Sequence, residues 1–374
     1  MRGRRVAWVA VADACIDLRQ VAERRADLER IWPYVPGRHR DEITAEYGVG
    51  DVLKLASNEN PLGPSPRAIE ALARRLSDVH YYPDSQARAL KAALADRHGL
   101  EPSQFVIGSG SVECIDLVAR AFLRPGDEAV VGFPTFPRFQ IACQVVGVRP
   151  RVVPHVDWRF DLDGLRGAVT ERTRVLFLDN PCNPTGTLIG PAELAGLLDD
   201  LPPETLVVLD RAYYEFEPAA TRFAEDLDRI GDGANLIVLR TFSKAHGLAG
   251  LRIGYAMARP EHARALDHVR EAFNASSLAQ IAALAALDDE TVETERAWLS
   301  ARFDELGLEH VSSVTNFLFT NLGGQAAEVN EALLSRGVVI RPMSAPGIET
   351  WARISVGDRG GNERLVAALA DALA

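Results

Sequence analysis

Short apolar segments alternate with amphipathic segments through the middle of this 374-residue chain. An apolar run between turn residues is typical of a buried strand, and apolar positions three and four residues apart are typical of a helix. The predicted strands of this region are Phe105–Gly108, Glu128–Gly132, Val148–Val153, Arg174–Asp179, Leu206–Asp210, Leu236–Arg240 and Arg252–Met257. Strands that alternate with helices in this way predict an α/β fold, with a mostly parallel sheet covered by helices on both faces.

The two ends of the chain predict a second, smaller α/β domain. A long helical region beyond Glu261 is followed by the predicted strands Phe317–Thr320, Val338–Arg341 and Trp351–Val356, with helices between and after them. We expect an N-terminal extension of residues 1–30, a small domain of residues 31–75 and 290–374, and a large domain of residues 76–289.

Residues 1–30 need separate consideration because MRGRR followed by VAWVAVADAC is similar to a short signal peptide. Asp13 and Asp17 interrupt the apolar part, and the charged, helix-favouring sequence VAERRADLER follows. We therefore interpret this segment as an extension or a helix. No apolar run approaches the length of a membrane span, so we expect no membrane partner.

Charge and cysteine usage narrow the function classes. The formal net charge is −11, and no basic block offsets it, which argues against a nucleic-acid partner. The four cysteines have neither the spacing of a zinc site nor that of a disulfide framework, and the eight histidines form no metal-binding pair. This pattern fits a reducing compartment, so we expect a cytoplasmic protein without a metal.

The candidate chemistry is concentrated in the stretch Thr241–Tyr255, TFSKAHGLAGLRIGY. Lys244 lies between small and hydroxyl residues, and a lysine in such a partly desolvated setting can lose its proton and attack a carbonyl. The hydroxyls of Thr241 and Ser243, together with Arg252, suit a phosphate. These features predict a pocket for a phosphorylated aldehyde held as a Schiff base, which is pyridoxal phosphate.

Other polar residues follow the carboxyl ends of the predicted strands, where open parallel sheets bind their ligands. A glycine-serine turn at Gly110-Ser111 enters a helix and offers an anion site. Asn183 follows one further predicted strand, and Asp210 is the last residue of another. We expect all of them to belong to one site.

Seven short motifs then occur in the order in which one enzyme family has them. They are YVPG at 34–37, KLASNENPLGPSP at 54–66, the turn at 82–84, NPTG at 183–186, the pair Asp210 and Tyr213, SKAHGLAGLRIGY at 243–255 and ARISVG at 352–357. Together they resemble the histidinol-phosphate aminotransferases, which are fold-type I pyridoxal-phosphate enzymes, over roughly residues 32–374. The resemblance implies a large cofactor-binding domain and a small domain built from both chain ends.

The resemblance also implies a role for each matched residue. Lys244 would hold the cofactor and move the substrate's proton, and Asp210 would pair with the ring nitrogen. Tyr213 and Asn183 would contact the phenolic oxygen, and Phe136 would stack on the ring. The residues implied to hold the cofactor phosphate are Gly110, Ser111, Thr241, Ser243 and Arg252, with Tyr82 contributed by the neighbouring subunit of a homodimer.

On the substrate side, Arg353 matches an arginine that binds the substrate's anionic end, and Arg341 lies where a second one occurs. Asn183 would help to orient the acid group, and Leu62 replaces a tyrosine that faces the substrate pocket. Val112 replaces an aspartate, and Arg211 replaces a glutamate. We expect these departures to affect substrate choice.

The hypothesis that follows is a homodimeric aminotransferase that works by ping-pong half-reactions, with histidinol phosphate as the first candidate donor and 2-oxoglutarate as acceptor. One alternative is transfer from another amino acid, aromatic or of specialised metabolism. Another is a decarboxylase or cyclising enzyme that uses the same lysine and aspartate. A non-catalytic pyridoxal-phosphate regulator is the third, and the joint presence of Lys244, Asp210, Tyr213 and Asn183 argues against it.

Overall fold

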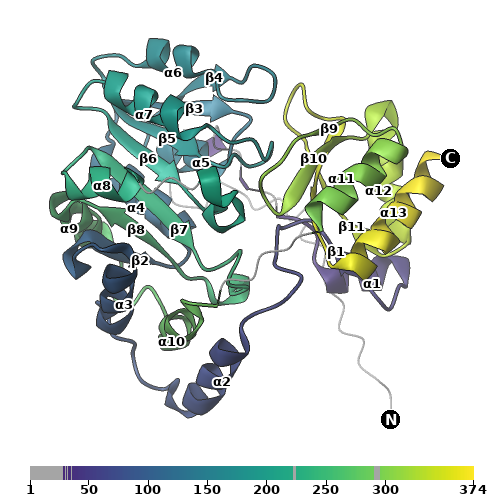
Figure 1. The fold of residues 1–374 in the computed structure, drawn as a ribbon, viewed down its shortest axis with the longest axis horizontal. Helices are drawn as coiled ribbons and strands as arrows, with labels where there is room; N and C mark the ends of the chain where they lie inside the picture. The colour runs from purple at the N-terminus through teal and green to yellow at the C-terminus, as the bar shows by residue number, and fades with distance from the viewer. Residues whose placement is uncertain (1–27, 30, 32, 35, 222–224, 290–294) are drawn as a thin grey trace, which may run out of the picture.

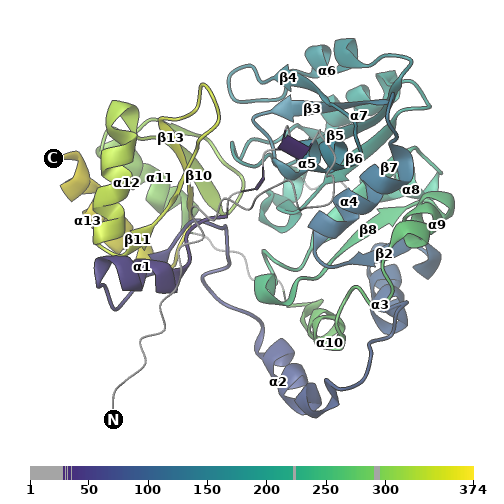
Figure 2. The same ribbon diagram turned by 180° about the vertical axis from the view of Figure 1, so that it is seen from behind.

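The computed structural model describes residues 28–29, 31, 33–34, 36–221, 225–289 and 295–374. Apart from Leu28 and Glu29, the predicted N-terminal extension lies outside the described residues. Figures 1 and 2 show two units side by side, a larger one built around a central sheet and a smaller one that contains the C-terminus. No helix in the described part of the chain is both long and apolar enough to cross a membrane.

The larger unit contains a seven-stranded sheet in the order β2-β8-β7-β6-β5-β3-β4. Its strands are β2 (Phe105–Gly108), β3 (Glu128–Phe133), β4 (Arg151–Pro154), β5 (Thr173–Asp179), β6 (Leu206–Asp210), β7 (Leu236–Thr241) and β8 (Gly254–Ala258). The predicted α/β fold with a mostly parallel sheet is confirmed, with one strand reversed: β8 runs antiparallel to both β2 and β7. Each predicted strand of this sheet is present, with bounds shifted by at most a few residues.

The period-two alternation of each central strand explains why helices cover both faces. Along β5, Leu176 and Leu178 point into one apolar cluster, whereas Val175 and Phe177 point into the other. The first face is covered by α3 (Arg88–His98), α6 (Leu162–Ala168), α7 (Pro191–Asp200), α8 (Glu225–Gly231) and α10 (Ser277–Ala286). The second face is covered by α4 (Ser111–Phe122), α5 (Arg138–Val145) and α9 (Pro260–Val269).

The smaller unit contains an antiparallel sheet in the order β12-β13-β10-β9. Its strands are β9 (His310–Val311), β10 (Phe317–Asn321), β12 (Arg341–Pro342) and β13 (Trp351–Ser355), and its helices are α11 (Arg296–Glu305), α12 (Ala326–Ser335) and α13 (Arg359–Leu373). The predicted strand Val338–Arg341 is divided into β11 (Val338–Val339) and β12, which belong to different sheets.

An N-terminal segment contacts the smaller unit. β1 (Leu53–Lys54) pairs in parallel with β11, and Ile43 of α1 (Arg40–Tyr47) packs beside Leu334 of α12. Helix α2 (Pro66–Arg75) instead packs against α10 of the larger unit. The two-domain division, with residues 31–75 in the small domain, stays a prediction, and the packing of α2 on α10 differs from it.

Candidate active site

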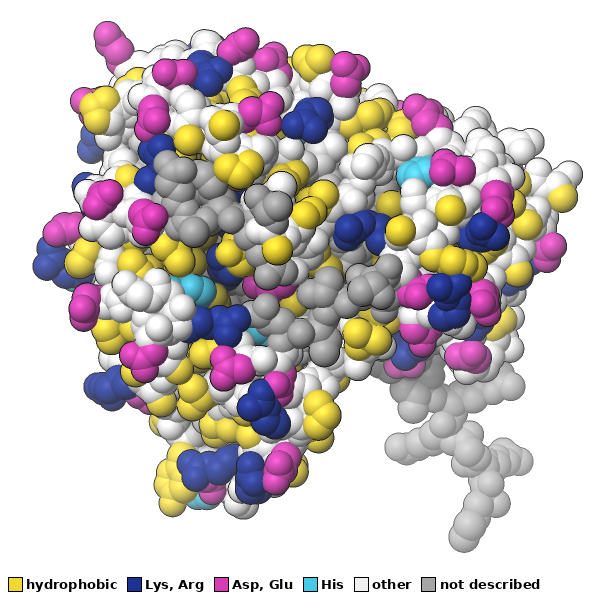
Figure 3. All heavy atoms as spheres, viewed as in Figure 1, with side chains coloured by type: hydrophobic (Ala, Val, Ile, Leu, Met, Phe, Trp, Pro, Cys, Tyr) yellow, Lys and Arg dark blue, Asp and Glu magenta, His cyan; other side chains and the backbone are white. Residues whose placement is uncertain are grey.

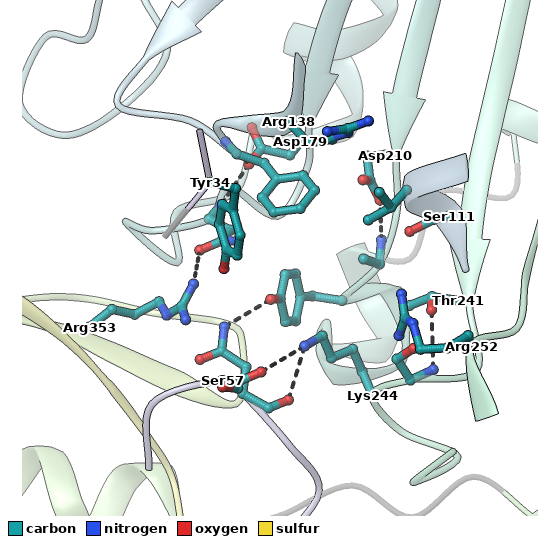
Figure 4. A pocket seen from close by; sticks show the side chains of 17 residues that line it. Tyr34, Ser57, Ser111, Arg138, Asp179, Asp210, Thr241, Lys244, Arg252 and Arg353 are labelled. Atoms are coloured by element: carbon teal, nitrogen blue, oxygen red, sulfur yellow. Dashed lines mark hydrogen bonds between the residues drawn. The ribbon is translucent and has the colours of Figure 1, made fainter. Parts of the chain in front are cut away.

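A cavity of about 330 Å³ lies where the carboxyl ends of β5, β6 and β7 face the smaller unit (Figure 4). Its walls come from both units: Ser57 and Asn58 follow β1, and Arg353 lies on β13. The lining residues are Tyr34, Ser57, Asn58, Ser111, Val112, Phe136, Arg138, Asp179, Asn183, Asp210, Ala212, Tyr213, Thr241, Ser243, Lys244, Arg252 and Arg353. Parallel strands bring their carboxyl ends to one edge of the sheet, so the predicted residues meet there.

Lys244 extends into this cavity from the turn after β7. Its Nζ donates hydrogen bonds to the backbone carbonyls of Ser57, at 3.0 Å, and Asn58, at 3.2 Å. Burial lowers the pKa of Lys244 to about 7, and the positive charge of Arg353 adds to this effect. A substantial fraction of the amine is therefore neutral near pH 7, as a nucleophile toward an aldehyde requires.

Asp210 ends β6 and lies deep in the same cavity, 4% exposed. In the described part of the chain, its carboxylate accepts one hydrogen bond, from the amide of Ala212 to Oδ1 at 3.0 Å. Burial raises the pKa of Asp210 to about 7, and the neighbouring charge of Asp179 raises it further. A buried carboxylate with unused acceptor capacity is suited to a cationic N–H donor such as a pyridinium.

Two hydrogen bonds in series, from side chains of the smaller unit, orient Tyr213. Asn58 Nδ2 donates to the hydroxyl oxygen of Tyr213 at 2.8 Å, and Ser355 Oγ donates to Asn58 Oδ1 at 3.1 Å. Because its oxygen is already an acceptor, the Tyr213 hydroxyl can direct its own proton into the cavity. Burial raises the pKa of Tyr213 to about 12, which keeps that proton in place.

Asn183 and Arg353 orient each other across the cavity. Arg353 Nη1 donates to Asn183 Oδ1 at 2.7 Å, and its Nη2 donates to the carbonyl of Ala56 at 2.8 Å. Since a guanidinium can only donate, the amide oxygen of Asn183 must face Arg353, which leaves the amide NH₂ to donate elsewhere in the cavity.

A cradle for an anion lies at the N-terminus of α4. Gly110 is the N-cap and provides no side-chain cap, so the first amides of the helix remain available to a ligand. A Cβ on Gly110 would lie 2.7 Å from Nη2 of Arg252, and one on Gly254 would lie 2.5 Å from the amide nitrogen of Ser111. Glycine at both positions lets Arg252 and the helix end come together, and Thr241 and Ser243 line the same part of the cavity.

Gly110 is not itself a lining residue but directly precedes Ser111, which is one, and three further predicted residues lie outside the cavity of this single chain. Leu62 is 53% exposed, and Tyr82 is 82% exposed, with its ring stacked on Phe273 at 4.7 Å between centroids. Arg341 is not a lining residue, but its guanidinium is 5.6 Å from the ring centre of Tyr34, which is one.

Arg211 does not face the cavity, so the expectation that it affects substrate choice needs correction. It is 1% exposed, and Nη1 contacts Glu217 Oε1 at 3.0 Å and the carbonyl of Asn180 at 3.1 Å. The alternation explains this orientation, because successive residues after Asp210 point to different sides of the strand. Val112, the other charge-changing departure, does line the cavity.

Sequence reasoning assigned no role to several lining residues, although some of them lie within the matched motifs: Tyr34, Ser57, Asn58, Arg138, Asp179 and Ala212. A signal for Asp179 was present, because it ends β5 as Asp210 ends the neighbouring strand, and the two are register partners. Arg138 pairs with Asp116 of α4, a contact between two helices that local sequence does not reveal.

The comparisons with known proteins agree with this geometry. The family model for aminotransferase class I and II matches residues 50–369. The chain belongs to the class I and II aminotransferase family. A histidinol-phosphate aminotransferase of Moorella thermoacetica is 44% identical over 363 residues, which cover 95% of this chain and 94% of that protein. The resemblance to the histidinol-phosphate aminotransferases is thereby confirmed.

Solved structures of the family have the same fold. The histidinol-phosphate aminotransferase of Sinorhizobium meliloti in complex with pyridoxal-5'-phosphate superposes with a TM-score of 0.85 at 29% identity, covering 95% of this chain and 99% of that one. The L-threonine-O-3-phosphate decarboxylase of Porphyromonas gingivalis superposes with a TM-score of 0.75 at 25% identity, covering 85% of this chain and 98% of that one. The fold is that of the fold-type I enzymes.

The protein is a pyridoxal-phosphate-dependent aminotransferase, and its cavity fits this cofactor. The partly neutral amine of Lys244 suits the aldehyde, the carboxylate of Asp210 suits the ring nitrogen, and the cradle between Gly110 and Arg252 suits the phosphate. The three groups lie in one cavity and have the chemical character that each part of the cofactor needs.

We predict that Gly110→Ala weakens cofactor binding by about 10-fold or more. The contacts of Arg252 with the phosphate should contribute about 1–2 kcal/mol of binding free energy, and they depend on the position of its guanidinium. The added methyl group would meet the Arg252 guanidinium at 2.7 Å, at a residue whose φ of +77° already disfavours a side chain. Fluorescence titration of the cofactor-free protein with pyridoxal phosphate measures the effect. Gly250→Ala is the matched control, since a Cβ there meets nothing within 4 Å. Equal affinities for the two variants would contradict the proposed cradle.

A second prediction concerns pH. The rate at which pyridoxal phosphate attaches to cofactor-free protein should rise with pH through about 7 and level off above it, because the reactive neutral fraction of Lys244 grows in that range. An ordinary lysine, with a pKa near 10.4, would be less reactive at pH 7 by about three orders of magnitude. Stopped-flow absorbance measures the rate. N-α-acetyl-lysine serves as reference and corrects for the ionisation of the cofactor itself. A protein rate that still rises in parallel with this reference up to pH 10 would disprove a depressed lysine pKa.

Proposed function

We propose that the enzyme transfers the amino group of L-histidinol phosphate to 2-oxoglutarate in two ping-pong half-reactions, in the cytoplasm. The observation that carries this proposal is the likeness to the Moorella thermoacetica histidinol-phosphate aminotransferase over nearly the full length of both chains. The scattered cysteines support the compartment, since the described ones are free and buried.

The anionic end of the substrate is assigned to Arg353. Its guanidinium is held from behind by Asn183 and Ala56, and its Nε is buried with no hydrogen-bond partner among the described residues. A buried donor without a partner is costly unless a ligand satisfies it. Arg341 is the register partner of Arg353 on the neighbouring strand and lies near Tyr34 of the lining, so a second cationic side chain lies close to Arg353. A phosphate monoester, with more acceptor oxygens than a carboxylate, suits such a surface.

Several of the lining residues have separate roles in the proposed reaction. When bound, pyridoxal phosphate supplies a ring that accepts the electron pair left on the substrate's α-carbon. Lys244 Nζ would hold the cofactor and, as a partly neutral amine, would carry the proton of the substrate's α-carbon. Asp210 would keep a proton on the ring nitrogen, and the amide of Asn183 and the hydroxyl of Tyr213 would donate to the phenolic oxygen. Burial of the cavity strengthens each of these interactions.

We assign completion of the site to a second copy of the chain, with Tyr82 reaching the partner's cofactor phosphate. The large hydrophobic side chains exposed on and after α2 support this assignment, as monomers rarely expose several together. They are Ile69 (50%), Leu76 (56%), Val79 (60%), Tyr81 (68%) and Tyr82 (82%). Figure 3 shows hydrophobic side chains among the charged ones at the lower end of this face, where α2 lies.

The substrate prediction is tested by absorption spectroscopy of the purified holoenzyme. Histidinol phosphate should convert the bound cofactor to its amine form, with loss of the visible band, and 2-oxoglutarate should restore it. Histidinol without the phosphate is the matched control and should react at least about 100-fold less efficiently, because it leaves a buried cation unpaired.

Conversion by another amino acid, with none by histidinol phosphate, would disprove the substrate and retain the aminotransferase. Release of carbon dioxide without accumulation of the amine form would instead indicate decarboxylation.

The dimer prediction is tested with hybrid subunits. Lys244→Ala should be inactive, and Tyr82→Ala should bind the cofactor weakly. In a hybrid of the two, one site combines the intact Lys244 of one subunit with the intact Tyr82 of the other, so activity and tight cofactor binding should return at half of the sites. Mixing the two variants under subunit-exchange conditions measures this. A mixture no more active than the sum of its parts would show that Tyr82 serves its own subunit or no site at all.

A further inference from the structure

Asp179 is a buried carboxylate in the cavity for which the reaction outlined above has no use. It ends β5, is 3% exposed and lies beside Asp210 as its register partner on β6. In Figure 4 it lies with Asp210 at the end of the cavity opposite Ser57 and Lys244. Burying a charge costs free energy unless donors compensate it, so its contacts indicate what it is there to hold.

Three donors converge on this carboxylate. The hydroxyl of Thr135 donates to Oδ1, while Oδ2 accepts the amide of Phe136 at 3.2 Å and the amide of Asn183 at 2.8 Å. These donors come from two loops, one after β3 and one after β5. Among the described residues, no other side chain at a strand end of the cavity connects these two loops. Burial raises the pKa of Asp179 to about 6, and the three donors oppose that rise, so it is mostly charged at pH 7 and above.

The two backbone positions held by Asp179 carry the side chains assigned to the cofactor ring. Phe136 is assigned to stack on the ring, and Asn183 to donate to its phenolic oxygen while its own Oδ1 accepts from Arg353. A displacement of the Asn183 backbone would therefore disturb both the cofactor and the arginine that binds the substrate's anion.

We propose that Asp179 is a positioning residue for the cofactor, which fixes Asn183 and Phe136 around the ring through their backbone amides. This proposal rests on the cofactor placement argued above and not on the identity of the substrate. Asp179 is not assigned to pair with the ring nitrogen, because both of its oxygens already accept hydrogen bonds from these donors, whereas Asp210 retains acceptor capacity.

The first test compares variants by cofactor affinity. Asp179→Ala removes the acceptors of both amides and should weaken pyridoxal-phosphate binding at least about 10-fold; if it does not fold, Asp179→Ser takes its place, since one short hydroxyl cannot hold three donors. Asp179→Asn should stay within about threefold of the parent, because its amide oxygen can hold both backbone amides while the Thr135 hydroxyl turns to accept from its NH₂. Equal losses in the alanine and asparagine variants would overturn the proposal and assign the effect to charge.

The second test is spectroscopic and separates positioning from structural damage. Donors to the phenolic oxygen favour its deprotonated form, so loss of the Asn183 contact should move the pH midpoint of the bound cofactor's absorption band upward by about one unit. Asp179→Ala should cause a similar shift. The midpoint of the double variant Asp179→Ala/Asn183→Ala should move no further than that of Asn183→Ala alone, because both substitutions remove the same interaction with the phenolic oxygen. Additive shifts, or an unchanged midpoint in Asp179→Ala, would refute the role.

Glu217→Gln is the control for structural damage alone. It breaks a buried ion pair with Arg211 close to the same strand ends, outside the cavity lining. This variant should lower thermal stability and leave the midpoint where it is. A midpoint shift equal to that of Asp179→Ala would show that any local destabilisation suffices. Should the parent protein show no cofactor band at all, the cofactor placement itself would fail, which is distinct from failure of the role of Asp179.

Discussion

The alignment of three neighbouring parallel strands is the constraint on which the site depends. Asp179, Asp210 and Thr241 end β5, β6 and β7, which are paired side by side in the sheet. Backbone hydrogen bonding sets the spacing of strands at roughly 4.8 Å, so the ring pocket and the start of the phosphate cradle are held by the sheet ladder rather than by loops. Rigid strands give a precision that flexible connections do not.

Desolvation is the second influence, and it acts on the lysine and the aspartate in opposite directions. Burial disfavours charge on both, which lowers the pKa of Lys244 and raises that of Asp210, each to about 7. The smaller unit contributes to this burial through Ser57 and Asn58, whose carbonyls contact Lys244. Arg353 of β13 comes from the same unit, and its positive charge further lowers the pKa of Lys244. Packing of the two units against each other therefore sets the protonation of Lys244 as well as the fold.

Much of this arrangement could be predicted from the sequence, because strand ends, motif residues and the parallel sheet follow from local pattern. Lys244, Asp210, Tyr213, Asn183 and Arg252 all meet in the cavity. The antiparallel β8 could not be predicted, since strand direction depends on pairing between distant segments. The same reason applies to helix α2, which packs on α10 rather than on the smaller unit. Asp179 was missed because its partners Thr135 and Phe136 belong to another loop.

Arg211 differs from the family motif, and its contacts stabilise the fold instead of reaching the ligand. Its guanidinium is buried against Glu217 and also binds the carbonyl of Asn180, directly after Asp179, so it ties the ends of β5 and β6 together. Removing one partner of such a pair leaves an uncompensated buried charge and typically costs about 3–5 kcal/mol. The identity of residue 211 is thus linked to that of residue 217 and not to the ligand. Determinants of substrate choice must be sought among the side chains that reach the cavity, and Val112 and Arg138 are two of these for which the proposed chemistry has no role.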